Sequence, residues 1–356
     1  MFQRSGARPR NVIERMKAMS QSRPLRGILQ FAVRLALAFA AMVLLPVGIA
    51  KALQRSPMPD VSAWIAGRDA RVQVRVFEGE AGEARPIPLN TYVLEVLLAN
   101  CDPSAPMASL EAASVAVRTY AVRAMLHPSL QARRERADLT DNPSLDLAME
   151  TEHELELSIG AQAALAFIAR AQSAIEATDG RILTYGGQPI LAFLCQISTG
   201  RTRSAAMALG DPLPYLKSIP CPDDASSPAR LSTITYTLGA FNQALSAHLS
   251  DFSQLRAVRS GDGFVQAVKA GDEVWGGPAF AANLGLASDD FTWVARGDRL
   301  VFTCYGRGSD LGMSLHEADA LASRGMSYVA ILAHFYPGAR LEDMLPIVQG
   351  LGNFGN

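Results

Sequence analysis

The chain has 356 residues, of which 49% are hydrophobic and 19% are charged, and this composition excludes intrinsic disorder as a description of the whole chain. Lys and Arg total 33 and Asp and Glu total 34, so the formal net charge is -1. Nucleic-acid-binding proteins usually carry a basic excess, and we therefore expect no nucleic-acid partner. The mean hydropathy of +0.11 is too low for a protein with several membrane spans and is typical of one hydrophobic segment attached to a globular domain.

The hydrophobic segment covers residues 28–50 and contains Arg34 as its one charged residue. About 20 apolar residues cross the core of a bilayer, so this segment predicts a transmembrane helix. Residues 1–27 form a basic tail with seven Lys and Arg residues against one acid. The positive-inside rule then predicts a single-pass cell-membrane protein with a cytoplasmic N-terminus and an extracytoplasmic C-terminal domain. Gly48 and Ala50 provide a small-x-small cleavage site, which leaves a cleaved signal peptide as the alternative.

The four cysteines are Cys101, Cys195, Cys221 and Cys304, and in an exported domain four cysteines can pair in three ways. Cys195 and Cys221 are the nearest pair in sequence and form the candidate disulfide. No C-x-x-C or H-x-x-x-H spacing occurs, and the five histidines are scattered. We therefore expect no structural zinc site and no cofactor.

The chain after the hydrophobic segment divides into a linker at 51–70, a folded domain at 71–345 and a C-terminal tail at 346–356. Pro57 and Pro59 mark the linker. Within the domain, helical and strand-like periods alternate irregularly, without βαβ repeats. We therefore predict a single α+β domain of mixed helices and antiparallel hairpins.

The individual elements follow from hydrophobic periodicity. Asn90 is a candidate N-cap for the first helix, and residues 131–156 lack a sustained period and are expected to form an irregular surface segment. Gly186 and Gly187 lie between two apolar runs and predict a hairpin over 181–194. The predicted helices cover residues 89–99, 110–126, 160–177, 314–323 and 328–335, and the other predicted strands cover 71–77, 233–237, 264–268 and 300–304.

Four segments of the domain carry motifs that occur in the same order in one known family. Residues 92–121 contain a helix, a turn and a second helix that ends in Arg-Thr-Tyr-Ala, and residues 174–190 contain a helix followed by the Gly-Gly hairpin. Residues 192–202 read AFLCQISTGRT, and residues 306–341 contain GRGSDLGMS and HFYPG. These motifs resemble the SpoIID/LytB family (stage II sporulation protein D and amidase enhancer) over nearly the whole of residues 71–345.

The resemblance implies a protein directed at peptidoglycan. The family includes lytic transglycosylases, which cut glycan strands after peptide removal, and proteins described as enhancers of cell-wall amidases. The implied partners are therefore peptidoglycan glycan strands and a cell-wall amidase, in addition to the membrane that holds the N-terminal helix.

A lytic transglycosylase needs one carboxylic acid that protonates the glycosidic oxygen and then accepts a proton from the sugar's 6-hydroxyl group. Alignment of the first motif places Asn100 at the position of the family's catalytic Glu, and an amide cannot relay a proton at neutral pH. Asp102 is a candidate for a displaced acid, although an Asp before Pro103 is also typical of a turn. Glu95 and Glu111 lie on the flanking helices, where carboxylates usually face solvent.

Two other functional positions of the family also differ here. Some members hold a metal with a His and cysteines, but those positions here are Cys195, Ser198 and residues 138–145, which contain no Cys or His. The family's Gly-His-Gly loop is shortened to residues 308–312 and has lost its His. The resemblance therefore implies a retained scaffold without its reactive groups.

Five side chains remain as candidates for binding a glycan. Arg118 and Tyr120 lie at the end of a helix whose counterpart in the family lines the cleft. Gln196 and Thr199 follow the hairpin. Tyr336 precedes the turn at Pro337 and Gly338. Each also has an ordinary structural interpretation as a core or turn residue.

Three hypotheses follow. The first is a membrane-anchored extracytoplasmic protein that binds peptidoglycan or modulates a wall amidase with little catalytic activity. The second is an active lytic transglycosylase that uses Asp102. The third is a structural membrane protein that contacts only protein partners.

Overall fold

The computed structural model describes residues 72–349. The predictions for the basic tail at 1–27, the transmembrane segment at 28–50 and the linker at 51–70 lie outside these residues. No helix within 72–349 is long and apolar enough to span a bilayer. The described part is a mixed α+β structure, in agreement with the predicted fold class.

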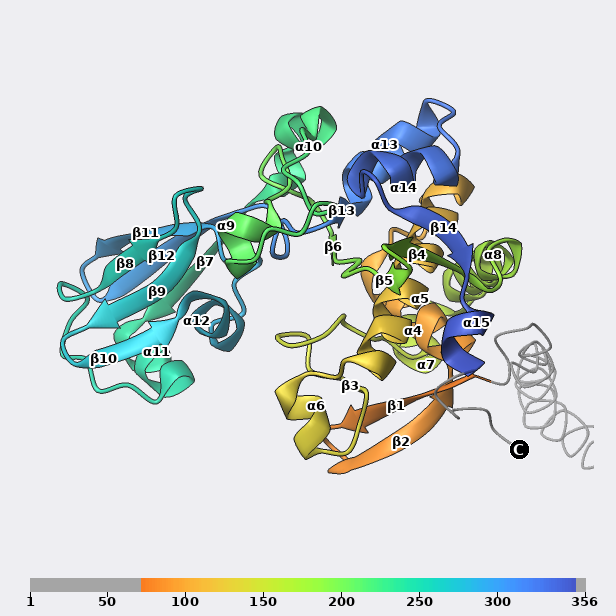
Figure 1. Ribbon diagram of the computed structural model, residues 1–356. Coiled ribbons are helices and arrows are strands. Elements are labelled where there is room, and N and C mark those ends of the chain that lie inside the picture. Colours follow the sequence, from red (N-terminus) through yellow and green to blue (C-terminus); the bar gives the residue numbers. More distant parts are fainter. Residues whose placement is uncertain (1–71, 350–356) are drawn as a thin grey trace, which may run out of the picture. The chain divides into compact units, whose positions relative to one another are not determined.

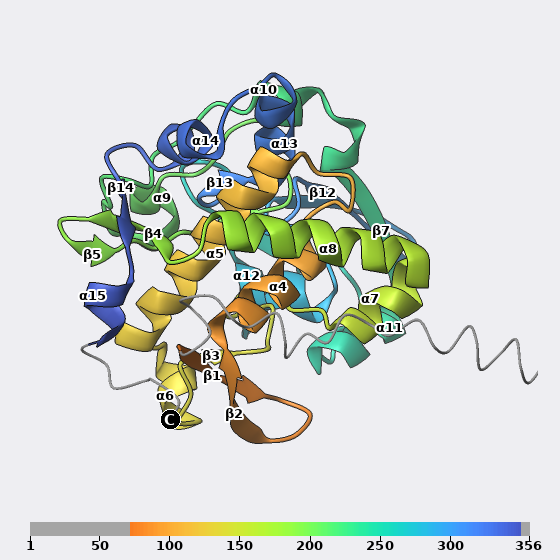
Figure 2. The same cartoon turned by 90° about the vertical axis from the view of Figure 1, so that its right-hand side faces the viewer.

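A central helix, α5 (Met107–Leu126), organises the larger part of the structure (Figures 1 and 2). Fourteen of its twenty residues are buried, on every side of the helix. A helix that is apolar all round is suited to a position inside a protein, with other elements covering each face. The helices that pack on α5 are α4 (Leu89–Asn100), α8 (Ala161–Ala177), α13 (Leu315–Ser323) and α14 (Tyr328–Phe335).

Small sheets flank this helical group. The predicted hairpin is present, and Gly186 and Gly187 make its turn with φ values of 60° and 77°, which favour glycine. The antiparallel sheet β14-β4-β5 consists of β14 (Arg340–Asp343), β4 (Arg181–Tyr185) and β5 (Gln188–Pro189). In the sheet β2-β1-β3, β1 (Gln73–Glu78) pairs antiparallel with β2 (Glu83–Pro88) and parallel with β3 (Leu139–Thr140). A short parallel pair joins β6 (Leu194–Cys195) to β13 (Met313–Ser314).

Residues 231–305 build a second hydrophobic core, which the sequence analysis did not separate from the first. Its centre is a group of buried phenylalanines whose rings lie 5.4–6.0 Å apart: Phe241, Phe252, Phe280, Phe291 and Phe302. Two antiparallel sheets and two helices enclose it. Their bounds are β7 (Leu231–Thr237), α11 (Leu238–Leu245), β8 (Arg256–Arg259), β9 (Val265–Ala270), β10 (Glu273–Gly276), α12 (Gly277–Asn283), β11 (Phe291–Arg296) and β12 (Arg299–Tyr305).

Arg203 joins the segment after β6 to this second core. Its Nε lies 2.9 Å from Asp262 Oδ2, and its Nη1 lies 3.6 Å from Asp289 Oδ2. Its guanidinium carbon lies 3.8 Å from the centre of the Phe264 ring, a cation–π contact. Because Arg203 is only 8% exposed, its ion pairs with Asp262 and Asp289 are largely shielded from water. They connect the segment after β6 to the second core.

The structure corrects two local predictions. Asn90 is not a cap: α4 begins at Leu89 after Pro88, and Asn90 is buried inside the helix. Residues 131–156 are also more regular than expected, because they overlap two helices and contain β3. These helices are α6 (Leu130–Arg134) and α7 (Glu152–Ile159), and α7 begins with a capping box between Thr151 and Glu154.

Three further short α-helices and a 3-10 helix, η2 (Pro228–Arg230), complete the described elements. The α-helices are α9 (Ala205–Leu209), α10 (Pro222–Ser226) and α15 (Leu345–Val348). Helix α15 lies almost wholly in the segment expected to be a tail, and its Val348 is buried. The folded part therefore extends past residue 345.

The first testable prediction concerns Arg118, which is fully buried in α5. Its guanidinium donates to the carbonyl oxygens of Ile175, Thr178 and Arg181 at 3.0–3.4 Å. Arg118→Met should lower the free energy of unfolding by at least about 3 kcal/mol in urea denaturation, because buried acceptors lose their donor. Arg123→Met is the matched control, since half-buried Arg123 donates to one carbonyl, that of Pro189. Equal losses in the two variants would contradict this account of α5.

Candidate functional site

The first turns of α13 bring together segments that are distant in sequence. The backbone N–H of His316 donates to the carbonyl of Gln196 at 3.1 Å, and Glu317 accepts hydrogen bonds from the backbone of α10. Asp319, one turn further along, accepts a hydrogen bond from Ser109 at the start of α5. The candidate site is therefore the surface where α13 meets the segment after β6, helix α10 and the loop between α4 and α5.

Asn100, which the sequence predicts to occupy the family's acid position, is the last residue of α4. Its side-chain amide donates to the carbonyl oxygens of Val96 at 2.8 Å and Ala148 at 2.9 Å. Both amide hydrogens are therefore used to tie the end of α4 to the segment before α7. In this arrangement the side chain is a structural link with no proton to transfer.

Asp102 forms a turn in the loop that follows. Its Oδ1 accepts hydrogen bonds from the backbone N–H of Ser104 at 2.7 Å and from the Ser104 hydroxyl at 2.6 Å. These hydrogen bonds stabilise the charged form and lower the pKa of Asp102. A carboxylate held in this way is a poor proton donor near neutral pH.

Asp319 is a carboxyl group near this loop that the sequence analysis did not consider. Burial, together with the nearby Asp102, raises the pKa of Asp319 to about 6 against the opposing effects of the Ser109 hydroxyl and His316. A carboxylic acid with a pKa near the working pH is suited to general acid catalysis. No local sequence signal marks Asp319, because its surroundings come from α5 and from the loop between α4 and α5.

His316 forms a pair with a buried aspartate of α10. Its Nδ1 lies 3.1 Å from Asp224 Oδ1, and Asp224 Oδ2 accepts the backbone N–H of Ser198 at 2.8 Å. The Asp224 side chain is fully buried, whereas that of His316 is 41% exposed. The pair therefore fixes the orientation of an imidazole that remains accessible from solvent.

Three of the predicted glycan-binding residues lie in the interior. Arg118 has no exposed surface, and its guanidinium serves the carbonyl groups at the end of α8. Tyr120 donates its hydroxyl to Asp146 at 2.9 Å, and Tyr336 donates its hydroxyl to the carbonyl of Phe193 at 2.6 Å. All three side chains position the segments around the site.

The other two predicted residues lie at the surface. Gln196 is exposed and lies next to Arg307, whose carbonyl accepts the Gln196 backbone N–H at 3.1 Å. Thr199 is half-buried, and its backbone N–H donates to Asp310 Oδ2 at 2.8 Å. The Arg307 side chain is also exposed, so an amide and a cation are offered to solvent by two residues that are paired through their backbones.

The shortened loop at 308–312 packs against the segment before β6. The backbone N–H of Met313 donates to the carbonyl of Phe193 at 3.0 Å. Gly312 has a φ of +75°, and a Cβ atom at this position would lie 1.9 Å from that carbonyl oxygen. This close approach requires glycine.

The four cysteines are free thiols in the structure, so the candidate bridge between Cys195 and Cys221 is not formed. The metal positions implied by the family do not fit a metal either. Cys195 is the one thiol among them, Ser198 supplies a hydroxyl, and residues 138–145 supply no Cys or His.

Two further carboxyl groups on the flanking helices have raised pKa values. Burial raises the pKa of Glu95 to about 7, with neighbouring acids adding to the effect and Arg85 opposing it. Burial also raises the pKa of Glu111. Glu95 lies five residues before Asn100 on α4, so the two side chains point to opposite sides of the helix.

Comparisons with known proteins support the family resemblance. The family model described as "SpoIID: Stage II sporulation protein" matches residues 78–185. The chain is 30% identical over 279 residues to "Stage II sporulation protein D" of Bacillus amyloliquefaciens, covering 78% of this chain and 80% of that protein. It is 28% identical over 332 residues to "Stage II sporulation protein D" of Bacillus subtilis (strain 168), covering 88% of this chain and 96% of that protein.

Asp310 generates a prediction on the pH dependence of stability. It is fully buried, its Oδ1 has no hydrogen-bond partner among the described residues, and burial raises its pKa from 3.8 to about 7. Between these values the folded state keeps a proton that the unfolded state loses, so the stabilisation present at low pH is lost as pH rises toward 7.

Asp310→Asn removes this titration and keeps an acceptor for Thr199. From about pH 5 to about pH 7, wild-type stability should therefore fall relative to the variant by up to about 1.4 kcal/mol per pH unit. Urea denaturation at several pH values measures this difference. Parallel curves for the two proteins would show that Asp310 is ionised in the folded state.

Proposed function

The chain belongs to the SpoIID family, and from this premise we propose that it is a membrane-anchored, extracytoplasmic protein that binds peptidoglycan glycan strands. Its transglycosylase activity is weak or lacking, and the bound strand is presented to a cell-wall amidase. The relatives' printed name refers to sporulation, and we extend only the cell-wall role of the family to this chain.

The observation that carries the proposal is the bonding of Asn100. Both hydrogens of its amide are donated to backbone carbonyls. The side chain at the expected acid position therefore connects the end of α4 to the segment before α7. Loss of general acid catalysis costs about 10²- to 10⁴-fold in rate. The scaffold around this position is nevertheless complete, since α4, α5 and the hairpin follow the family order.

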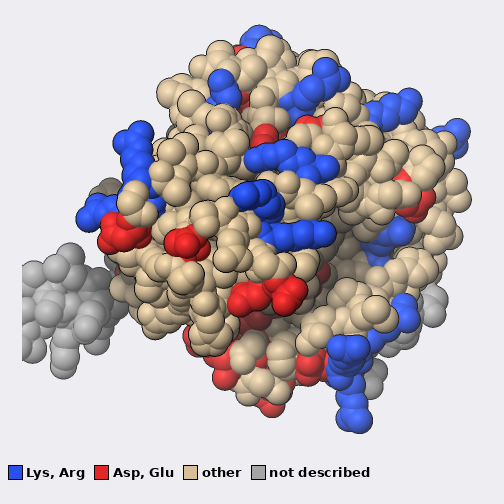
Figure 3. Space-filling view, turned by 90° about the vertical axis from the view of Figure 1, so that its left-hand side faces the viewer, with Lys and Arg blue, Asp and Glu red and all other residues tan. Residues whose placement is uncertain are grey.

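The exposed groups near α13 are chemically suited to a peptide-free glycan strand. Gln196 supplies an amide for sugar hydroxyls, and Arg307 supplies a cation for the lactyl carboxylate of muramic acid. The accessible imidazole of His316 lies on the same side, since its backbone is bonded to Gln196. Figure 3 shows a different face, that of the second core, where Lys and Arg side chains lie beside a hollow and Asp and Glu side chains lie next to them.

An active lytic transglycosylase is the second candidate, and one observation favours it. Asp102 is held ionised by Ser104, but the pKa of the Asp319 carboxyl is raised to about 6 close to the same loop. In this candidate Asp319, rather than Asp102, donates the proton to the glycosidic oxygen. The third hypothesis, contact with protein partners only, requires that the surface near α13 binds no glycan.

A sedimentation assay with purified sacculi tests the binding proposal. We expect the full-length chain to sediment with sacculi from which peptides have been removed, and Arg307→Gln to weaken binding about tenfold, equivalent to about 1.4 kcal/mol. Arg296→Gln, at the exposed last residue of β11, is the matched charge control and should bind like wild type. Absence of binding by the wild-type chain would leave only the protein-partner hypothesis.

Mass spectrometry of the same incubations separates the first two candidates. The leading proposal predicts no anhydro-muramyl products above a protein-free control. If such products form, Asp319→Asn should abolish them under the second candidate, whereas Asp102→Asn should leave them unchanged. Products that Asp319→Asn abolishes would therefore replace the leading proposal with an active enzyme.

A further inference from the structure

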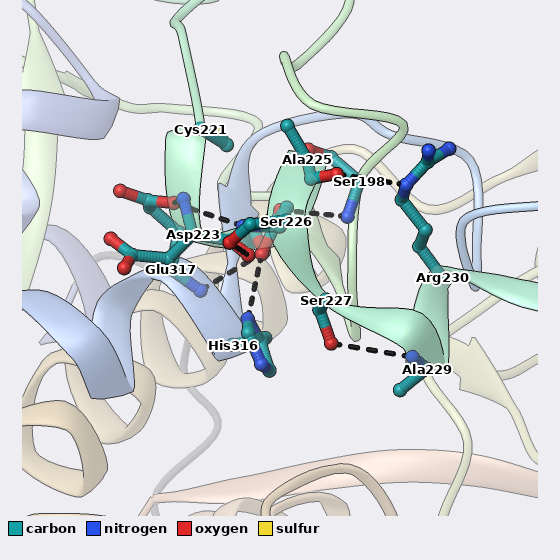
Figure 4. Close-up of polar contacts among 12 residues, drawn as sticks. Ser198, Cys221, Asp223, Ala225, Ser226, Ser227, Ala229, Arg230, His316 and Glu317 are labelled. Carbon is teal, nitrogen blue, oxygen red and sulfur yellow. Dashed lines mark hydrogen bonds and ion pairs between the residues drawn. The ribbon is translucent and has the colours of Figure 1, made fainter.

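A compact group of potential metal ligands lies between α10 and α13, next to the exposed His316 of the surface proposed to bind glycan. One ligand atom each from Cys221, Asp224 and Glu317 lies within 4.8 Å of the other two, and all three residues are buried. Figure 4 shows Cys221 and α10 on one side of this group and His316 and Glu317 of α13 on the other. The His316 Nδ1 atom lies 3.1 Å from Asp224 Oδ1, so an imidazole borders the same group.

The charges of this group are not balanced by the side chains that contact it. Asp224 and Glu317 supply two buried carboxyl groups, and Asp223, which is 32% exposed, supplies a third beside them. The arginine in contact with them is Arg324, which lies 2.8 Å from Asp223 and 3.8 Å from Glu317 and is itself 54% exposed. Buried carboxylates are stable when paired or bound to a metal, and a divalent cation would supply the missing charge.

We propose that Cys221, Asp224 and Glu317 bind a divalent transition-metal ion of the zinc class, with His316 as the fourth ligand. A thiolate, an imidazole and two carboxylates are donors that Zn²⁺ accepts, and structural zinc sites are four-coordinate. The thiol argues against Mg²⁺ and Ca²⁺, which take oxygen ligands. This inference goes beyond the proposed function, because it assigns a binding site that glycan recognition does not require.

Hydrogen bonds from the backbone already orient both carboxylates. Asp224 Oδ2 accepts the backbone N–H of Ser198 at 2.8 Å, and Glu317 Oε2 accepts the backbone N–H of Asp223 at 2.8 Å. Such outer contacts fix the direction of the ligand oxygens in metal sites. A rotation of the His316 side chain, whose Nδ1 lies 3.1 Å from Asp224 Oδ1, would add the imidazole to the three ligand atoms that already lie within 4.8 Å of one another.

A metal here would join two elements that otherwise meet through hydrogen bonds and ion pairs. Helix α10 has five residues and depends on α13 for its position, since Glu317 accepts hydrogen bonds from its first turn. A bound ion would lock α10 to α13, and therefore hold His316 and the backbone of Gln196, which His316 contacts. We expect the metal to stabilise the domain rather than to take part in chemistry.

Metal binding to the full-length chain tests the proposal. After dialysis against a chelator, titration with zinc sulfate should give one tightly bound ion per chain and raise the melting temperature. Titration with cobalt(II) should give a thiolate-to-cobalt charge-transfer band and the visible absorption of a tetrahedral site. Cys221→Ser should abolish the charge-transfer band and weaken zinc binding by at least about 100-fold.

Cys304→Ser is the matched control, because Cys304 is a buried free thiol in β12 within the second core, and it should keep the band and the affinity. Glu317→Gln preserves an acceptor for the backbone of α10 and serves as a second variant, which should fold but bind zinc more weakly. Absence of stoichiometric binding by the wild-type chain, or a charge-transfer band that survives in Cys221→Ser, would overturn the proposal. Neither result depends on whether the chain binds sacculi.

Discussion

The structure depends on a helix that has no solvent-facing side. Helix α5 carries fourteen buried residues out of twenty, and its neighbours α4, α8, α13 and α14 owe their positions to contact with it. One of those buried residues is Arg118, whose guanidinium binds the carbonyl groups at the end of α8 and the start of β4. A buried charge is tolerable only when its donors are satisfied, so this residue fixes the hairpin that leads to the candidate site.

Helix α13 extends this arrangement to the surface. It packs on α5, its His316 and Glu317 contact α10, and its Asp319 accepts a hydrogen bond from Ser109 at the start of α5. The family's acid position lies in the same neighbourhood, but Asn100 there binds two backbone carbonyls. We propose that this scaffold binds a glycan strand without the proton donor expected at position 100, and Asp319 is a nearby carboxyl group whose pKa is raised to about 6.

Much of the fold could be predicted from the sequence, because its signals are local: α5 and α14 follow a helical period, and Gly186 and Gly187 specify their own turn. The prediction that Asn90 caps α4 was wrong, because no side chain caps this helix. Its first residue, Leu89, is held instead by a backbone hydrogen bond to the carbonyl of Val72. The environments of Asp319 and of the His316–Asp224 pair could not be predicted, since their partners are distant in the chain. Spacing rules for metal sites likewise do not mark Cys221 and Glu317, which we propose as metal ligands.

Hydrogen–deuterium exchange of the full-length chain, with and without peptide-free glycan strands, tests the central claim most directly, namely that the surface near α13 holds the strand. The account predicts slower exchange in the backbone amides of residues 196–199, 307–320 and 100–106 when the glycan is present. Residues 231–240, on β7 and the start of α11, should exchange at the same rate in both samples. Protection confined to the second core, or no protection anywhere, would contradict the account.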